Sequence, residues 1–256
     1  MLAPLLALLL AAPPAPAACA LPPLAGPPPF GPGEVLSMEL GLLGAVRVGE
    51  LQFSVERSAG AGQLLTLAGR ARNTARFGPL QRLVAVGLSW VDARTLRPER
   101  YREESDEDGH RHVSDTRLSP PGPQVVMALT DDGRAGRVTY QRQGAALDAV
   151  SALYYLRAAR LAPGDRFCFD MVGNGKYWRV EGRVAPAPEQ VEVPAGRFQA
   201  LRLEATARRA DGQGKPRPLW VWLGADRRRL PVAAVTEVDL GPVSAKLVEV
   251  RGARAP

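Results

Sequence analysis

The chain carries only two histidines, and they stand two residues apart in its most polar stretch. His110 and His112 follow several Glu and Asp residues within 103–108, and the pair would share one face of a strand. Imidazole and carboxylate groups in this setting could hold a divalent metal. A solvated hairpin with its tip at Glu107-Asp108-Gly109 explains the same residues. We favour the hairpin, and no metal site is assigned.

Signatures of known catalytic sites are absent from the sequence. There is no Gly-x-Ser-x-Gly elbow, no phosphate-binding Gly-rich loop with Lys and no His-Glu-x-x-His helix. Asp148 and Ser151 lie three residues apart, as a helix cap and a first-turn polar residue do. We assign no catalytic residue and no cofactor, and favour a protein that is not an enzyme. The competing hypothesis is an envelope hydrolase that acts on carbohydrate. Its catalytic carboxylates would be far apart in the sequence and come together only in the folded protein. The candidates are Asp148, Asp165, Asp170 and Asp226.

Aromatic and arginine residues are the remaining candidates for binding. Trp220 and Trp222 share one face of a predicted strand whose opposite face is also apolar, so this strand should be buried or line an internal cavity. Three arginines follow in a predicted turn, where guanidinium groups could bind the anionic headgroup of an amphiphile. The predicted ligand-binding residues are Tyr154, Tyr155, Trp178, Trp220, Trp222, Arg227, Arg228 and Arg229. Core packing and a solvated turn are the alternative explanation.

The charge of the chain bears on its partners. With 33 Lys and Arg against 26 Asp and Glu, the net charge is +7, which favours anionic surfaces such as phospholipid headgroups. The arginine-rich composition of a GC-rich genome would produce the same charge. Sequence-specific nucleic-acid binding is not expected, because no reading helix and no RNP-like strand is present.

The N-terminus is typical of an exported protein. Residues 2–12 are nearly all Leu and Ala, and small residues follow at 17–20, as in a secretory signal peptide. The run is too short to span a bilayer, and no other stretch is long enough. We predict a signal peptide over 1–20, a Pro-rich linker over 21–33 and a periplasmic or secreted protein. The alternative is an outer-membrane lipoprotein acylated at Cys19.

Two cysteines are present. Cys168 lies between Phe167 and Phe169 in a predicted strand, and its partner is either Cys19 or absent. Because free cysteine behaves as a small apolar residue, we favour a buried structural Cys168 and leave its pairing open.

Period-two alternation dominates the chain from residue 34 onward. Leu51, Phe53 and Val55 alternate with polar residues, as in a half-solvated antiparallel sheet. Turn signals such as Gly173-Asn174-Gly175 separate the alternating runs. Residues 148–161 instead have helical spacing, with Asp148 as the N-cap. We predict a mainly β protein with a single domain over 34–251: an antiparallel curved sheet or barrel, lipocalin-like or a spiral half-barrel, with one inserted α-helix near 148–161.

Several short motifs, in order, carry a family resemblance. They are Pro32-Gly33-Glu34, the run from Leu147 to Arg157, Gly164-Asp165, Val193-Pro194-Ala195-Gly196-Arg197-Phe198, Leu219-Trp220-Val221-Trp222-Leu223 and Arg229-Leu230-Pro231-Val232. Across residues 30–250 the chain resembles an uncharacterised family of exported bacterial proteins, domain of unknown function 3108. An aromatic residue expected in the first strand, 36–40, is missing. The resemblance implies an envelope-associated β protein and brings no activity, cofactor or catalytic residue.

These observations lead to one functional prediction with two alternatives. We predict a non-enzymatic periplasmic or cell-envelope protein that binds an apolar or amphiphilic ligand or a partner protein and does not span the membrane. The alternatives are the envelope hydrolase and a purely structural envelope protein.

Overall fold

The structure is a computed structural model, and it describes residues 19–44, 46–57, 64–74, 82–238 and 241–252. Most of the predicted signal peptide lies outside the described residues. The strands are β1 (Val35–Leu42), β2 (Val46–Arg57), β3 (Leu64–Asn73), β4 (Leu83–Asp92), β5 (Pro98–Glu107), β6 (His110–Arg117), β7 (Gln124–Asp131), β8 (Arg134–Gln141), β9 (Ala146–Asp148), β10 (Arg166–Gly173), β11 (Lys176–Val184), β12 (Glu189–Val193), β13 (Gly196–Arg209), β14 (Arg217–Gly224), β15 (Pro231–Val238) and β16 (Gly241–Arg251). Helix α1 spans Ala149–Ala158.

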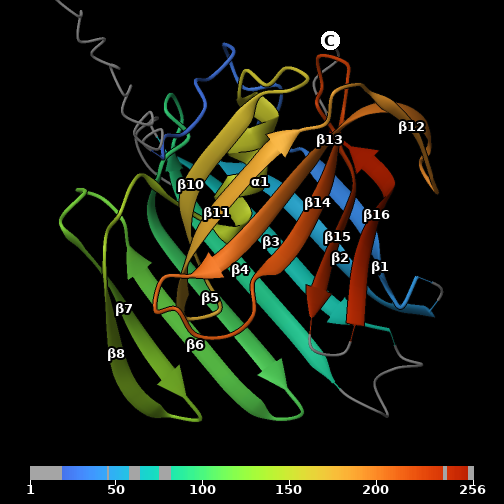
Figure 1. Cartoon of the computed structure of the whole chain (residues 1–256). Coiled ribbons are helices and arrows are strands. Elements are labelled where there is room, and N and C mark those ends of the chain that lie inside the picture. The colour runs from blue at the N-terminus through green and yellow to red at the C-terminus, as the bar shows by residue number, and fades with distance from the viewer. Residues whose placement is uncertain (1–18, 45, 58–63, 75–81, 239–240, 253–256) are drawn as a thin grey trace, which may run out of the picture.

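All these strands belong to one curved sheet (Figure 1). Its order is β8-β7-β6-β5-β4-β3-β2-β1-β16-β15-β14-β13-β11-β10-β9, and β12 pairs with β13 outside this path. Neighbouring strands are antiparallel, except for the parallel pair β9 and β10. Strands β8 and β9 lie at the two ends of the order, so the sheet curls around without closing into a barrel. The predicted curved antiparallel β fold is confirmed.

Tight turns join several neighbouring strands, as the turn residues predicted. Asn174 and Gly175 both have positive φ, 52° and 61°, between β10 and β11. Asp108 and Gly109 do the same between β5 and β6, so the predicted polar hairpin and its tip are present. Two consecutive positive φ values define the turn whose twist matches that of the flanking strands.

Helix α1 lies inside the curve of the sheet, between β3 and β4 on one side and β10 on the other (Figure 1). It ends three residues before the predicted boundary, at Ala158. Val150 and Tyr154 are buried, whereas Leu153 is half-buried. Gly69 and Gly87 lie beneath Val150, and a Cβ atom at either position would come within 3.2 or 3.1 Å of it. The glycines therefore allow the helix to approach the sheet closely.

Residues 19–33 pack along the C-terminal half of helix α1. Phe30 is buried against the ring of Tyr154, with the ring centroids 4.8 Å apart. The backbone N–H of Ala25 donates to the carbonyl of Ala158, and Leu24 forms an isolated bridge with Ala159. These contacts join the stretch before the first strand to the core.

Candidate ligand-binding groove

The inner face of β2–β5 holds a cleft of about 380 Å³ beside the N-terminal end of helix α1, here called the inner groove. The strand register sets its floor, because Ala71 lies opposite Ala85, and Gly69 lies opposite Gly87. These small side chains leave space that larger residues would fill. Apolar walls surround the floor; they include Leu51, Phe53, Leu83, Tyr101 and Val150. The volume falls within the usual range of small-ligand pockets, roughly 300–1,000 Å³.

Glu103 holds one side of the inner groove in place. Its carboxylate accepts hydrogen bonds from the backbone N–H groups of Asn174 (2.9 Å) and Gly175 (2.7 Å), in the turn between β10 and β11. The hydroxyl of Tyr101 also donates to it, at 3.1 Å. Burial and the nearby carboxylates raise the pKa of Tyr101 well above its ordinary value, so this hydroxyl keeps its proton. Glu103 thus connects β5 to the opposite side of the curved sheet.

The two histidines stand at the edge of this region. Nδ1 of His112 contacts the carboxylate of Asp131, and its buried Nε2 has no hydrogen-bond partner among the described residues. His110 is exposed, and its hydrogen bond with Asp132 raises the pKa of its imidazole. No group of three or more His, Cys, Asp or Glu side chains is arranged to hold a metal ion in the described part of the chain.

Asp148 caps helix α1 and is fully buried. Its Oδ1 accepts from the N–H groups of Val150 and Ser151, at 2.9 and 2.8 Å. Its Oδ2 accepts from the hydroxyls of Ser89 on β4 (2.6 Å) and Ser151 (2.8 Å). Burial nevertheless raises the pKa of Asp148 to about 6, because desolvation of the charged form outweighs these hydrogen bonds. The predicted role as a cap is confirmed.

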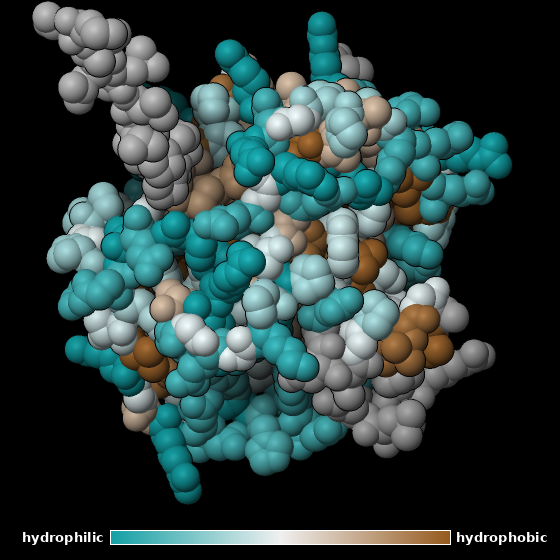
Figure 2. Space-filling model, in the orientation of Figure 1, coloured by the Kyte–Doolittle hydropathy of each residue, from teal (hydrophilic) through white to brown (hydrophobic). Residues whose placement is uncertain are grey.

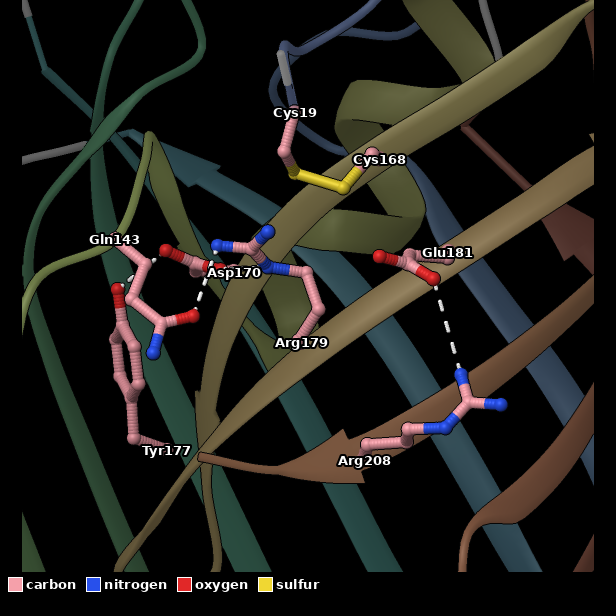
Figure 3. The surroundings of a disulfide bond; sticks show 8 residues. All are labelled: Cys19, Gln143, Cys168, Asp170, Tyr177, Arg179, Glu181 and Arg208. Atoms are coloured by element: carbon pink, nitrogen blue, oxygen red, sulfur yellow. Dashed lines mark hydrogen bonds and ion pairs between the residues drawn. A yellow bond between two sulfur atoms is a disulfide. The ribbon is translucent and has the colours of Figure 1, made fainter. Parts of the chain in front are cut away.

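The other three carboxylates proposed for a hydrolase also make local contacts. Asp170 is buried and accepts from the Tyr177 hydroxyl and from Nε of Arg179, both at 2.6 Å (Figure 3). Asp165 accepts from the N–H of Ala162, and Asp226 accepts from the backbone of the following turn. None of the four carboxylates lines the inner groove.

Trp220 and Trp222 lie on the outer face of β14, and the prediction that this strand lines an internal cavity is wrong. Val221 and Leu223 point into the core and are buried, whereas both indoles are half-buried, and that of Trp222 packs against a second apolar cluster. Trp220 borders an open hollow on the outer face of β10, β11, β13 and β14. Charged pairs such as Glu181 with Arg208 cross this region (Figure 3). The outer surface seen in Figure 2 is mostly hydrophilic, with scattered apolar patches.

The other predicted aromatic residues lie on the core side. Tyr154 packs between Phe30 and Phe53, and its hydroxyl is buried without a partner among the described residues. The hydroxyl of Tyr155 donates to the carbonyl of Pro22, at 2.9 Å. Nε1 of Trp178 donates to the carbonyl of Gly173. These aromatic side chains therefore do not share a wall with Trp220 and Trp222.

The predicted arginine turn faces helix α1 with its backbone. The guanidinium of Arg157 donates to the carbonyls of Arg228 (3.4 Å) and Arg229 (3.2 Å). The guanidinium of Arg229 itself donates to the carbonyl of Leu161, while Arg227 is exposed. The eight predicted binding residues are thus divided between the outer face, the core and this turn. Their role in binding a ligand stays a prediction.

A disulfide bond joins Cys19 to Cys168 on β10 (Figure 3). Cys168 is half-buried, so the expectation of a fully buried side chain is wrong. The neighbouring aromatic residues suggested burial, but Cys168 is on the opposite face of β10 from the buried Phe167 and Phe169. The alternative that left Cys19 as its partner is the observed one.

Comparison with known proteins places the chain in a family. The family model described as protein of unknown function (DUF3108) matches residues 37–248. The chain belongs to this family. No match was found among curated proteins.

Solved structures resemble this DUF3108 protein in fold. A β-barrel-like DUF1849 protein from Brucella abortus has a TM-score of 0.52 at 12% identity; the match covers 85% of this chain and 96% of that one. An exported protein with a YmcC-like fold from Bacteroides fragilis has a TM-score of 0.36 at 14% identity, over 91% and 100% of the two chains. A hypothetical protein from Chlamydia trachomatis has a TM-score of 0.36 at 9% identity, over 88% and 89%. The first of these likenesses supports the β-barrel-like fold.

Three of the motifs that carried the DUF3108 resemblance meet at one buried ion pair. Nη1 and Nη2 of Arg157 donate to the two carboxylate oxygens of Glu34, at 2.6 and 3.0 Å, and both side chains are almost completely buried. The guanidinium also lies over the rings of Phe30 and Tyr154, 5.0 and 5.3 Å from their centroids. Sequence reasoning missed this site, because Arg157 resembled a charged residue at a helix C-terminus.

Proposed function

We propose that this DUF3108 protein is an envelope protein that holds the apolar part of an amphiphile in the inner groove. The observation that supports the proposal most directly is the groove itself, where small floor residues meet apolar walls. A groove of this kind removes hydrocarbon from water, which contributes about 0.8 kcal/mol for each buried CH₂.

The proposed location rests on two features of the chain. Disulfides persist in oxidising compartments such as the periplasm, and Cys19 is paired with Cys168. The apolar run at 2–12 has the length of a signal peptide, and its cleavage must precede Cys19, not follow residue 20, if the mature protein is to keep the disulfide. A sulfur atom in a disulfide cannot also carry a thioether-linked lipid, so we favour a periplasmic protein over the lipoprotein anchored through Cys19. Among the described residues, no helix is long and apolar enough to cross a membrane.

A groove-filling substitution tests the proposal. We expect Ala85→Phe to weaken binding of the uncharged amphiphile dodecyl maltoside by at least about tenfold in isothermal titration calorimetry, because the ring would occupy the floor. The matched control is Val84→Phe, which adds a ring of similar size on the outer face of the same strand. Equal binding by the wild type and Ala85→Phe would show that the amphiphile lies elsewhere, and no binding to the wild type would refute the proposed function.

A further inference from the structure

The inner groove has the opposite charge to the rest of the chain. The net charge of the protein is +7, yet none of the described Lys and Arg side chains lines the groove. Its charged lining residues are instead glutamates, with His112 beside them. The charge of Glu104 is neutralised, because its carboxylate forms an ion pair with Arg111 at 2.6 Å. The two glutamates that remain are Glu103 and Glu107.

Neither of these two carboxylates has a cationic partner among the described residues. Glu103 is held only by the neutral donors described above, two backbone N–H groups and one tyrosine hydroxyl. Glu107 is exposed at the end of β5, and its carboxylate makes no hydrogen bond or ion pair with any described residue. Many other glutamates of the sheet are paired with arginine, as Glu50 is with Arg72. Among the described residues, no cation therefore compensates the negative charge of these two carboxylates at the polar side of the apolar groove.

We propose that the ligand of the inner groove is a cationic amphiphile, with its hydrocarbon against the apolar walls and an amine beside Glu103 and Glu107. This inference rests on the proposed function and adds the chemical class of the headgroup. An ammonium group supplies three hydrogen-bond donors and a positive charge, whereas the two carboxylates of the groove without a cationic partner are hydrogen-bond acceptors. An anionic headgroup at the same place would meet like charge.

The position of the carboxylates strengthens their effect on such a ligand. Beside low-dielectric walls, a charge interacts more strongly with its partner than it would in bulk water. The overall positive charge of the protein acts in the opposite direction and attracts anions to its surface. A preference for a cationic amphiphile would thus come from the groove and not from the net charge, which makes the two sources separable by experiment.

Three probes with the same hydrocarbon length test the headgroup preference. Dodecylammonium, dodecyl maltoside and dodecanoate should be titrated below their micelle concentrations into the oxidised protein, at low salt. We expect dodecylammonium to bind about tenfold more tightly than dodecyl maltoside, and dodecanoate to bind most weakly in the groove. Added salt should reduce the advantage of dodecylammonium, because screening weakens exposed charge pairs.

Substitutions locate the effect at the groove. Glu107→Gln should lower dodecylammonium affinity roughly three- to fivefold and leave dodecyl maltoside affinity unchanged. The control Glu99→Gln removes an exposed carboxylate from the same strand, outside the groove lining, and should change neither. Ala85→Phe should weaken both amphiphiles. Glu107 is the better test residue than Glu103, whose loss would also release the turn between β10 and β11.

The outcomes separate this inference from the proposed function. If dodecyl maltoside and dodecylammonium bind equally well, or if Glu107→Gln has no effect on either, the cationic headgroup is refuted and the apolar groove remains. If dodecanoate binds most tightly and competes with dodecyl maltoside, the charge preference is the reverse of the one proposed. If no probe binds, the proposed function fails together with the inference.

Discussion

The inner face of the sheet has two halves that differ in how completely their space is filled. On β10, β11, β13 and β14, large residues such as Phe169, Val180 and Leu203 point inward and are buried in the main core. On β3 and β4, small residues such as Ala71 and Ala85 occupy the corresponding inward positions. A groove therefore remains beside the helix. Both halves consist of alternating strands, so side-chain volume, and not the alternation itself, decides which half is open.

The helix is the element that divides the halves, and its two ends are held differently. At its C-terminal end, Arg157 pairs with Glu34 through two short hydrogen bonds in a fully buried site. At its N-terminal end, Asp148 is buried among hydroxyl and N–H donors without a cation. One end is therefore secured by an ion pair and the other by hydrogen bonds to a carboxylate with a raised pKa.

Breaking the ion pair should have the largest effect on stability. Arg157→Ala would leave the carboxylate of Glu34 buried without a partner, and we expect a loss of about 3–5 kcal/mol in the free energy of unfolding. Urea denaturation of the oxidised protein measures this loss. Arg160→Ala, three residues along and exposed, should change stability by less than about 0.5 kcal/mol. A loss below about 1 kcal/mol for Arg157→Ala would mean that the ion pair does not hold this end of the helix.

The contrast between the two halves can be measured with one pair of leucines. Leu203→Ala, in the filled half, should destabilise the protein by about 2–5 kcal/mol, since Leu203 is only 2% exposed. Leu83→Ala, on the wall of the inner groove, should cost less than about 1 kcal/mol, because its side chain is already partly in contact with solvent. Similar losses at both positions in chemical denaturation would show that the groove is packed as tightly as the core.

The sequence was sufficient to predict features that depend on near neighbours. The helix cap at Asp148, the turn at Asn174-Gly175 and the hairpin tip at Asp108-Gly109 all follow from residues a few positions apart. The curved antiparallel sheet followed from alternation repeated along the chain.

Features that depend on distant residues could not be predicted in the same way. The disulfide joins cysteines that are 149 residues apart, and only the closed fold brings them together. The inner groove requires Gly69 to align with Gly87, which depends on strand register. The sequence could not show which face of the sheet Trp220 occupies, because both faces of β14 carry apolar residues and alternation there holds no information about direction.

The remaining expected effect on stability concerns the N-terminal end of the helix and depends on pH. The pKa of Asp148 is raised from 3.8 to about 6 by burial, so the folded protein binds a proton that the unfolded chain has released between these pH values. The free energy of unfolding therefore decreases as pH rises through this window, and the stabilisation from the bound proton is lost above pH 6. Asn is as good an N-cap as Asp, but it cannot ionise. We therefore expect Asp148→Asn to gain stability relative to the wild type between pH 4 and pH 7, by up to about 3 kcal/mol.

The difference between the two proteins at each pH is the quantity to measure, by urea denaturation in matched buffers. Other carboxylates titrate equally in both proteins, so their contributions cancel in this difference. The side-chain amide introduced by Asp148→Asn would both accept from the helix N–H groups and donate to Ser89 or Ser151, which would keep the hydrogen-bonded connection between helix α1 and β4. A difference that stays constant from pH 4 to pH 7 would show that Asp148 ionises in the folded protein as easily as in water. The hydroxyl and N–H donors would then compensate fully for burial, and the N-terminal end of the helix would be held as firmly as the end with the ion pair.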